Sequence, residues 1–430
     1  MSLAAEFSCL SDHDPDSLSV DQARVFIRRQ LTPVRTRERV ALRGALGRVL
    51  ACDLLAPFNV PGHDNSAMDG YAVRHADIAN GGNTRLRVLG TALAGKAFAQ
   101  PIGEGECVRI MTGAPPPAGA DTVVVQEVVA LDGDHIVVPP GQRLGQHIRR
   151  AGEDLAVGKS ALAAGRLLRP AEIGLIASLG CAEVSVFRRL RVAFLSTGDE
   201  LCSIGTPLSE GRVYDSNRYT IFGMLTRVGC EVLDLGVVRD DPVAMEAAFS
   251  EAVAADVVIC SGGVSVGEAD FVKGLMAELG EVLFWKIAMK PGRPMAFGRI
   301  RVDGEENRDE RGGAAWLFGL PGNPVAVMVT FYQFVREALY ALMGADPVPV
   351  VPLLPALCTG ALKKVAGRTE FQRGILSLVD GQWRVRPAAA QGSGVLRSMA
   401  DANCFIVLEH DRGNVAAGDR VGVQLFDGLV

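Results

Sequence analysis

The sequence lacks the cysteine and histidine patterns that mark zinc sites and disulfide frameworks. Its nine cysteines are scattered and include no C-x-x-C pair, and its six histidines form no H-E-x-x-H motif. An odd number of unclustered cysteines is typical of reduced thiols inside a cell. We therefore expect a cytoplasmic protein that does not carry out zinc-dependent hydrolysis.

Long apolar runs and an excess of basic charge are also missing. No stretch of about 18 consecutive apolar residues occurs, so the sequence predicts no membrane-spanning helix. The acidic first twenty residues have neither the basic nor the apolar region of a signal peptide. The formal net charge of -5 argues against a general nucleic-acid binder, and it means that an anionic ligand would need a local positive pocket.

The chain does contain enough apolar sequence for several folded domains. It has 430 residues, of which 48% are hydrophobic and 22% charged. At about 150 residues per domain, this length suggests two to four domains. Ser19 and Gln22 form a candidate capping box for a helix over 19–31, and a second short helix is expected around 46–55. Between residues 59 and 150, short β-rich runs alternate with turns, including a hairpin around Asp132-Gly133.

Residues 191–342 alternate between strand patterns and helix patterns. Such alternation predicts a doubly wound parallel sheet with helices on both faces. Residues 301–313 are charged and predict a solvated loop without chemistry. The sequence further predicts helix starts at Pro170, at Ser216 or Asn217, at Asp241-Pro242, at Phe271 and at Pro324, the last helix running to Leu342.

The expected fold is thus an α/β multidomain protein. Its parts are an N-terminal helical linker domain, an inserted β domain, a central doubly wound α/β domain and a small C-terminal β domain that is barrel-like. The boundaries that we predict for these four domains are 1–58 together with 145–188, 59–144, 189–345 and 346–430.

Candidate site residues follow the predicted strands, because open α/β sheets bind ligands at the carboxyl ends of their strands. Glycine turns and helix starts there offer N–H groups to an oxyanion, lysine and arginine offer positive charge, and carboxylates suit Mg²⁺. Phosphate together with Mg²⁺ would explain why acids and bases share one site. The segments are LSTGDEL (195–201), SGGVSVGEADF (261–271), KIAMKPGRP (286–294) and PGNP (321–324).

Each segment also has an ordinary structural explanation. Asp241 and Asp270 precede predicted helices and could serve only as N-caps. Lys290 could be a solvated surface lysine, and PGNP could be only a rigid turn. Glu268 and Asp270 stand where a phosphate alone needs no carboxylate, so they would face a metal ion or a proton. Four such segments at successive strand ends favour one shared site over four unrelated turns.

Several motifs, in this order along the chain, carry a resemblance to a known family. They are DNSAMDGYAV, RIMTGAPPPAGAD, RRAGEDL, LSTGDEL, YDSNR, RDDP, SGGVSVGEADF, KPGRPMAFG and GLPGNPVAV. Together they resemble the molybdopterin molybdenumtransferase family of the MoeA type, which is related to the C-terminal domain of gephyrin. The resemblance runs from about Ser19 to the C-terminus, and it implies that the central α/β domain is of the molybdopterin-binding type.

The resemblance implies a reaction and an assembly. Adenylylated molybdopterin and molybdate would yield molybdenum cofactor and AMP with the help of Mg²⁺, and tungstate remains an alternative oxyanion because its shape is nearly the same. The family forms homodimers whose site lies between the α/β domain of one subunit and the inserted β domain of the other. Transient contact with the molybdopterin adenylyltransferase and with molybdoenzymes is also implied, but no nucleic acid and no membrane.

The resemblance also assigns residues. Positions matching the family's catalytic pattern are Asp69, Thr112, Glu200, Asp240, Asp270, Lys286, Lys290 and Arg373. Expected substrate-binding positions are Gly262, Gly263, Ser265, Pro321, Gly322, Asn323, Pro324 and Ser393. Asp69 and Thr112 would come from the partner subunit, and Asp154 matches an acidic position of open role.

The implied roles follow from charge and hydrogen bonding. Glu200, Asp240 and Asp270 would hold Mg²⁺, and Lys286, Lys290 and Arg373 would attract molybdate and offset charge on the breaking phosphoanhydride. The pterin phosphate or pyrophosphate would be held by the donors of Gly262, Gly263 and Ser265.

Two alternatives stand beside this reaction. One is the molybdopterin adenylyltransferase step, for which the inserted β domain has no use. The other is a molybdopterin-binding scaffold without catalysis, which could dispense with the acids and lysines that are present here.

Overall fold

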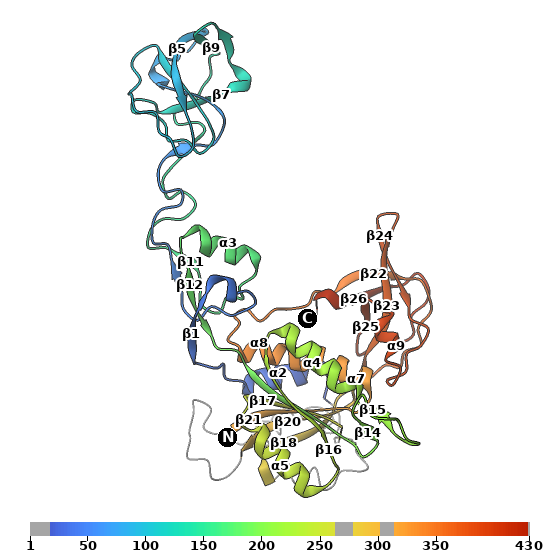
Figure 1. The fold of residues 1–430 in the computed structure, drawn as a ribbon. Helices are drawn as coiled ribbons and strands as arrows, with labels where there is room; N and C mark the ends of the chain where they lie inside the picture. Colours follow the sequence, from blue (N-terminus) through green and yellow to red (C-terminus); the bar gives the residue numbers. More distant parts are fainter. Residues whose placement is uncertain (1–17, 263–277, 302–313, 429–430) are drawn as a thin grey trace. The chain divides into compact units, whose positions relative to one another are not determined.

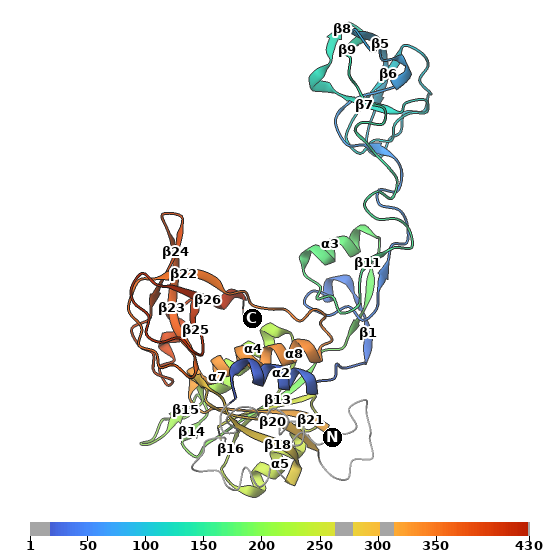
Figure 2. The same cartoon turned by 180° about the vertical axis from the view of Figure 1, so that it is seen from behind.

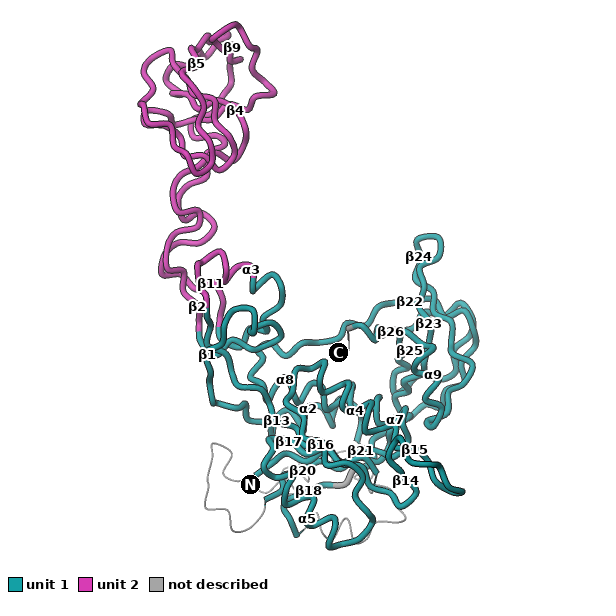
Figure 3. Tube along the Cα trace, in the orientation of Figure 1, with its two compact units in different colours: residues 1–52, 164–173, 183–430 teal, residues 53–163, 174–182 magenta. Residues whose placement is uncertain are grey.

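The computed structural model describes residues 18–262, 278–301 and 314–428. The chain forms two compact units, shown in different colours in Figure 3. The inserted unit comprises Asp53–Ala163 and Gly174–Ala182, and the main unit comprises Met1–Cys52, Ala164–Ile173 and Glu183–Val430. The predicted division into four domains stays a prediction.

A six-stranded sheet forms the centre of the main unit (Figure 1). The first four strands in space are parallel, as predicted, whereas the fifth pairs antiparallel with both of its neighbours and so runs opposite to the other five strands of this sheet. In spatial order the strands are β16 (Glu231–Val238), β13 (Arg191–Thr197), β17 (Val257–Ser261), β21 (Ala314–Leu320), β20 (Pro294–Arg301) and β18 (Gly280–Lys286).

Helices cover both faces of this sheet, as the alternation predicts, and Figures 1 and 2 show them on opposite sides. Val192 and Phe194 of β13 pack in the core beneath one set of helices, while Ala193 and Leu195 pack in the core on the other face. This alternation is the two-residue period of a strand that is buried on both sides. On the first face lie α2 (Val20–Gln30), α4 (Ser216–Val228), α7 (Pro324–Thr330) and α8 (Arg336–Leu342), and on the second face α5 (Pro242–Ala252).

Several predicted helix starts are confirmed, and one predicted N-cap is wrong. The Ser19–Gln22 capping box opens α2, Asp241 caps α5, and Pro324 opens a helix that continues through a π-helical turn to Leu342. The cap of α4 is neither Ser216 nor Asn217 but Asp215, whose carboxylate accepts a hydrogen bond from the amide of Arg218. Asn217 therefore lies inside the first turn. The start predicted at Phe271 lies outside the described residues.

The helix over 324–342 is long and apolar enough to cross a membrane by length and composition. In the structure 78% of it is buried inside the protein, against the sheet and α4. Its apolar surface is therefore accounted for by the core of the main unit.

The helix predicted around 46–55 is wrong. The structure has a short 3₁₀ turn over Leu42–Gly44 and extended chain beyond it, with Gly47 at a φ of 74°. Val49 and Leu50 bury their side chains by bridging to Leu167 and Val186. Tertiary pairing of these apolar residues outweighs their helical preference. The neighbouring strands of this part are β1 (Arg37–Ala41) and β12 (Glu183–Phe187).

The inserted unit is built mainly of β-strands, as predicted. Its six-stranded sheet has the order β7-β4-β6-β5-β9-β8, and the hairpin at Asp132-Gly133 is confirmed by the antiparallel pairing of β8 with β9. The strands are β2 (Leu54–Leu55), β3 (Asn65–Ser66), β4 (Gly70–Val73), β5 (Thr84–Ala92), β6 (Glu106–Ile110), β7 (Thr122–Val125), β8 (Ala130–Asp132), β9 (His135–Val138), β10 (Ile148–Arg149) and β11 (Ser160–Leu162). Helix α3 (Pro170–Ser178) begins at the predicted proline.

The C-terminal part of the main unit is a small closed β-barrel. The sheet runs β19-β23-β24-β22-β26-β25, and the additional pairing of β23 with β25 closes it. Its elements are β22 (Leu354–Cys358), β23 (Thr369–Val379), β24 (Gln382–Pro387), α9 (Arg397–Ala400), β25 (Cys404–Leu408) and β26 (Arg420–Leu425). Strand β19 (Met289–Lys290) joins this barrel from the α/β domain, and β14 (Leu201–Cys202) pairs with β15 (Val213–Tyr214) beside the α/β sheet.

Candidate active site

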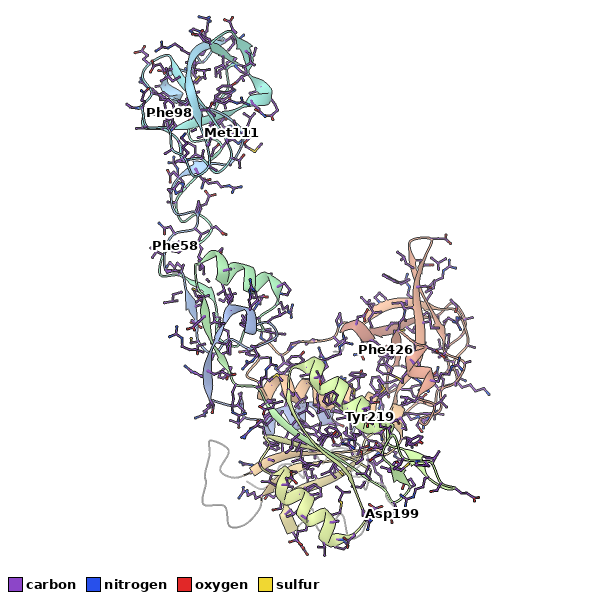
Figure 4. The ribbon with its side chains drawn as sticks, in the orientation of Figure 1. Phe58, Phe98, Met111, Asp199, Tyr219 and Phe426 are labelled. Carbon is purple, nitrogen blue, oxygen red and sulfur yellow. The ribbon has the colours of Figure 1, made fainter. Side chains whose placement is uncertain are left out.

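Three neighbouring strands end at the same edge of the α/β sheet. Ser196 of β13 lies opposite Ser261 of β17, and Ser261 lies opposite Leu320 of β21. The segments LSTGDEL, SGGVSVGEADF and PGNP leave the sheet from these positions. Figure 4 labels Asp199, which directly follows β13 at this edge. The expected convergence of strand-end segments is therefore present for the residues that the structure describes.

At Gly262 the segment that follows β17 lies close to the backbone at the end of β13. The φ of Gly262 is 97°, and a Cβ atom placed on this glycine would lie 2.4 Å from the carbonyl oxygen of Thr197. Only glycine fits this combination of a positive φ and a close backbone approach. Its amide donates a hydrogen bond of 3.2 Å to the carbonyl of Leu320. This amide is therefore used within the protein, and Gly262 allows the strand ends to pack together. The role of Gly262 in binding substrate stays a prediction.

Asn217 ties two of the strand ends together, and sequence reasoning missed this. Its Nδ2 donates hydrogen bonds to the hydroxyl of Ser261 at 2.9 Å and to the carbonyl of Gly322 at 2.7 Å. The asparagine comes from the first turn of α4 and is 8% exposed. The YDSNR motif was the signal for this residue, but its spacing indicates only a helix start.

Two of the three expected metal ligands are described. Glu200 is exposed after β13, and its carboxylate lies against Gly198, since a Cβ placed on that glycine would come within 2.7 Å of it. Asp240 is exposed after the neighbouring strand β16. Burial raises the pKa of the Cys260 thiol in β17 to about 12, and the negative charge of Asp240 adds to this rise. Asp240 thus lies close to the end of β17.

The donor chemistry of this edge fits a magnesium ion. Mg²⁺ commonly binds one or two carboxylates and completes its shell with water and substrate phosphate oxygens. Glu200 and Asp240 provide two carboxylates on adjacent strand ends. Within residues 18–262, 278–301 and 314–428, no cluster of three or more histidine, cysteine or acidic side chains could hold a metal by itself.

The expected lysines lie on the segment that leaves the sheet toward the barrel. Lys286 is half-buried at the end of β18, and its carbonyl accepts a hydrogen bond from the amide of Leu18. Lys290 is exposed in β19, which pairs in parallel with β23 so that Lys290 lies opposite Glu370. Backbone hydrogen bonds to other segments therefore hold the main chain at Lys286 and at Lys290. The two lysines lie on one short segment, four residues apart.

The PGNP loop connects the sheet edge to the barrel. Pro321 is buried, Pro324 starts α7, and the Asn323 side chain at the N-cap makes no capping hydrogen bond. The amide of Val325 instead donates a hydrogen bond of 3.0 Å to the carbonyl of Ser393. Ser393, the expected residue of the QGSG motif, is therefore held at the start of α7.

Arg373 is a buried cation beneath the loop that carries Ser393. It is 1% exposed, and burial lowers the pKa of its guanidinium to about 10, so it stays charged at neutral pH. Its Nε donates to the hydroxyl of Ser398, and its Nη2 donates to the carbonyls of Ala390 and Gly392. These contacts give Arg373 the role of shaping the loop in addition to the positive charge that was expected of it.

Gln391 completes this arrangement, and no feature of the amino-acid sequence indicates its role. Its Oε1 accepts a hydrogen bond from the amide of Arg373, while its Nε2 donates to the carbonyls of Arg373 and Ala388. The side chain thus ties the loop to β23. A single glutamine beside a glycine-rich motif cannot be assigned such a role without the fold.

Asp69 and Thr112 lie together in the inserted unit. One carboxylate oxygen of Asp69 accepts hydrogen bonds from both the amide and the hydroxyl of Thr112, each of 2.7 Å. These bonds, the backbone one foremost, lower the pKa of the Asp69 carboxyl. Met111, labelled in Figure 4, precedes the threonine. Two motifs 43 residues apart therefore form one polar pair.

The main chain of Asp154 forms a hydrogen bond within the inserted unit. Asp154 is exposed, and its amide donates a hydrogen bond of 3.1 Å to the carbonyl of Val60. In the same part of the inserted unit, Asp64 accepts hydrogen bonds from the guanidinium of Arg150 and the amide of Ala151. The motifs DNSAMDGYAV and RRAGEDL are thus joined by an ion pair.

Four predicted positions fall outside the described residues. They are Gly263, Ser265, Glu268 and Asp270, together with nearly all of the charged segment 301–313.

Comparison with known proteins places the whole chain in one group. Residues 18–180 match the MoeA N-terminal region (domain I and II), residues 193–341 a probable molybdopterin binding domain, and residues 355–426 the MoeA C-terminal region (domain IV). A molybdopterin molybdenumtransferase of Haemophilus influenzae is 45% identical over 416 residues, which covers 96% of this chain and 100% of that relative. One from Nostoc sp. is 35% identical over 390 residues, 89% of this chain and 87% of that relative.

Solved structures agree with this grouping. The crystal structure of the molybdopterin biosynthesis moeA protein from Pyrococcus horikoshii OT3 superposes with a TM-score of 0.79 at 27% identity. The match covers 95% of this chain and 100% of that chain. The predicted fold class is therefore confirmed by an experimentally determined relative.

Proposed function

Because the chain belongs to the MoeA family of molybdopterin molybdenumtransferases, we propose that it inserts molybdate into adenylylated molybdopterin during molybdenum cofactor biosynthesis, with release of AMP. The family match covers nearly the whole chain, including the inserted β domain and the barrel. The runner-up enzyme, a molybdopterin adenylyltransferase, has no need of these two parts.

The observation that carries the proposal is the convergence of three glycine-containing strand ends at one edge of the sheet. The backbones of Thr197, Gly262 and Leu320 lie close together at this edge. A substrate could contact main-chain atoms there, at the place where open α/β sheets bind ligands. Acids from two adjacent strand ends and lysines on a nearby segment supply both signs of charge. An oxyanion, a phosphoanhydride and a divalent cation together need such a mixture.

The acidic side chains have a consistent role in this reaction. Glu200 and Asp240 would hold Mg²⁺, with Asp270 as the third expected ligand. When bound, Mg²⁺ would supply positive charge that offsets the negative charge developing as the bond to AMP breaks. The contact of Glu200 with Gly198 limits the directions in which this carboxylate can point.

The basic side chains would act on the anionic substrates. Lys286 and Lys290 would attract molybdate and offset charge on the phosphoanhydride, each as a mobile point charge. Arg373 would add a fixed charge from below the loop of Ser393, because its hydrogen bonds to loop carbonyls hold it in place. The dithiolene sulfurs belong to the substrate, so no cysteine cluster is needed.

Asp69 and Thr112 would complete the site in a homodimer. The two residues form one hydrogen-bonded pair in the inserted unit, which is a separate compact body from the main unit. We propose that each site combines the main unit of one subunit with this pair from the partner subunit. The adenylyltransferase and molybdoenzymes would be transient partners of a cytoplasmic protein.

Two substrate mixtures separate the competing functions. The transferase predicts AMP release from adenylylated molybdopterin that depends on molybdate and Mg²⁺. An adenylyltransferase would instead consume ATP and molybdopterin and would not respond to molybdate. A scaffold protein would bind molybdopterin but turn over neither mixture, and that result would overturn the proposal.

Mixed dimers test the shared site. Asp69→Ala and Lys290→Ala variants would each be inactive alone, but a mixed dimer would regain one intact site when the two changes lie in different subunits. About a quarter of wild-type activity is expected for a random mixture, since half of the dimers are mixed and each carries one intact site. A mixture as inactive as its parents would show that both residues act within one subunit.

A further inference from the structure

We propose that Asn217 is a further substrate-binding residue, whose side-chain oxygen accepts a hydrogen bond from an N–H or O–H group of the substrate. The inference rests on the proposed function, and it assigns a role to the YDSNR motif. The observation behind it is a buried amide whose nitrogen is fully used and whose oxygen has no partner among the described residues.

The direction of the amide is fixed by chemistry. The carbonyl of Gly322 can only accept a hydrogen bond, so the group facing it at 2.7 Å must be Nδ2. The same nitrogen donates its second hydrogen to the hydroxyl of Ser261. Exchanging the positions of Oδ1 and Nδ2 would place two acceptors against each other. The oxygen of Asn217 therefore points away from both partners.

That oxygen is buried at the sheet edge and has no donor among the residues that the structure describes. Asn217 is 8% exposed, and its Oδ1 makes no hydrogen bond within the part of the chain that the structure describes. The hydroxyl of Ser196, fully buried, is also without a partner there. Ser196 and Ser261 share the face of the sheet covered by α4, because side chains alternate along each strand.

A buried polar atom without a hydrogen-bond partner destabilises the folded protein, and a ligand that supplies the partner removes this cost. The ligand group must be a donor, because an amide oxygen only accepts. This excludes molybdate and ionised phosphate as the groups that Asn217 contacts. The proposed substrate carries three kinds of donor, namely the N–H groups of the pterin, the hydroxyl groups of the ribose and the amino group of the adenine in its AMP part.

The test measures binding of molybdopterin, AMP and 2′,3′-dideoxy-AMP to the full-length protein by calorimetry. Asn217→Leu removes the acceptor, and Ser261→Ala removes one partner of Nδ2 but leaves Oδ1 in place. Asn403→Leu is a matched control, because the Asn403 amide also ties down backbone, at Leu376 in the barrel. If Asn217→Leu does not fold, Asn217→Ser serves as the second variant.

Two results support the proposal. A contact with the AMP part predicts that Asn217→Leu weakens AMP binding about tenfold. Binding of dideoxy-AMP is then unchanged for a ribose contact and equally weakened for an adenine contact. A pterin contact predicts a similar loss for molybdopterin only, with Ser261→Ala and Asn403→Leu binding like the wild type. In either case the ligand group that contacts Asn217 is identified.

Two results overturn it. Wild-type affinity of Asn217→Leu for all three probes would mean that its oxygen faces no ligand. An equal loss in Asn217→Leu and Ser261→Ala for every probe, dideoxy-AMP included, would show that Asn217 only positions the Gly322 backbone. Failure of the wild type to bind any probe would instead refute the proposed function on which the inference rests.

Discussion

The amide of Val325 donates a hydrogen bond of 3.0 Å to the carbonyl of Ser393. This bond joins the first turn of α7, which follows the PGNP loop, to the QGSG loop of the C-terminal barrel. The barrel therefore contributes directly to the sheet edge, although some 70 residues separate the two motifs. This explains how a small β domain at the end of the chain can affect chemistry at the α/β sheet.

Replacing Arg373 tests the loop that this bond anchors. Arg373→Leu removes a buried guanidinium, so the carbonyl of Ala390 loses its Arg373 donor and the carbonyl of Gly392 keeps only the amide of Val395. We expect a loss of about 2–3 kcal/mol in the free energy of unfolding, measured by denaturant titration. The KM for molybdate should rise in Arg373→Lys, because lysine keeps the charge but not the planar set of donors.

The matched control is Arg397→Leu in α9. Arg397 is an exposed arginine paired only with Asp401 on the surface, so its loss should change stability by less than about 0.5 kcal/mol. Equal effects at the two positions would contradict the role assigned to the buried cation.

Gly262→Ala tests the close approach of the strand ends. The added methyl group would lie 2.4 Å from the carbonyl oxygen of Thr197, and the φ of 97° would strain any other residue. Gly418 has a nearly equal φ of 94° and open space around it. Gly418→Ala should therefore show the strain alone, and Gly262→Ala should be at least about 1 kcal/mol less stable than this control.

Activity separates the two glycine variants further. AMP release should fall more than tenfold in Gly262→Ala and stay near the wild-type rate in Gly418→Ala. A fully active Gly262→Ala protein would mean that this sheet edge is not where the substrate reacts.

Gly198→Ala tests the placement of Glu200. A methyl group at this position would come within 2.7 Å of the Glu200 carboxylate and displace it. We expect the Mg²⁺ concentration for half-maximal activity to rise severalfold, since one expected ligand moves. Gly205→Ala, with open space around a φ of 87°, is the control in the same region. An unchanged Mg²⁺ requirement in Gly198→Ala would argue against Glu200 as a ligand.

The Asp69–Thr112 pair predicts a pH dependence. Hydrogen bonds from Thr112 lower the pKa of Asp69, so the ionised carboxylate is favoured in the folded protein. The bonds should be complete above the ordinary aspartate pKa of about 3.9 and lost as pH falls through the lower folded value. The Thr112 amide resonance in NMR spectra should titrate with that lower midpoint.

Two substitutions check this assignment. Thr112→Val removes the hydroxyl donor but keeps the amide, so the midpoint should move upward toward the ordinary value. Asp69→Asn should abolish the titration. A Thr112 amide that titrates equally in Asp69→Asn would show that another group is responsible.

Local sequence signals predicted much of the α/β domain. The Ser19–Gln22 capping box, the Asp241 cap and the proline at 324 each act within a single helical turn, so neighbouring residues suffice to recognise them. Buried strands can also be recognised in the sequence, because they are apolar runs that end at glycine-containing turns. These local signals identify the ends of the strands, and therefore the edge of the sheet at which we expect the candidate site.

Features that depend on distant residues were missed or misjudged. The segment around Val49 and Leu50 looks helical alone but is extended, because its partners lie more than 100 residues away. The burial of Arg373 and the use of the Gly262 amide by Leu320 likewise depend on packing between separate segments. Asn217 appeared to be only a helix cap, since nothing nearby in the sequence reveals its contact with Gly322.

The most direct measurement is single-turnover AMP release from adenylylated molybdopterin, with and without molybdate, by the wild type, Glu200→Ala and Glu210→Ala. Glu210 is an exposed acid in the same domain and serves as the control. We predict molybdate-dependent release by the wild type and Glu210→Ala, and at least a hundredfold slower release by Glu200→Ala. Release that is independent of molybdate, or that is equally fast in Glu200→Ala, would contradict a molybdenumtransferase site at this edge of the sheet.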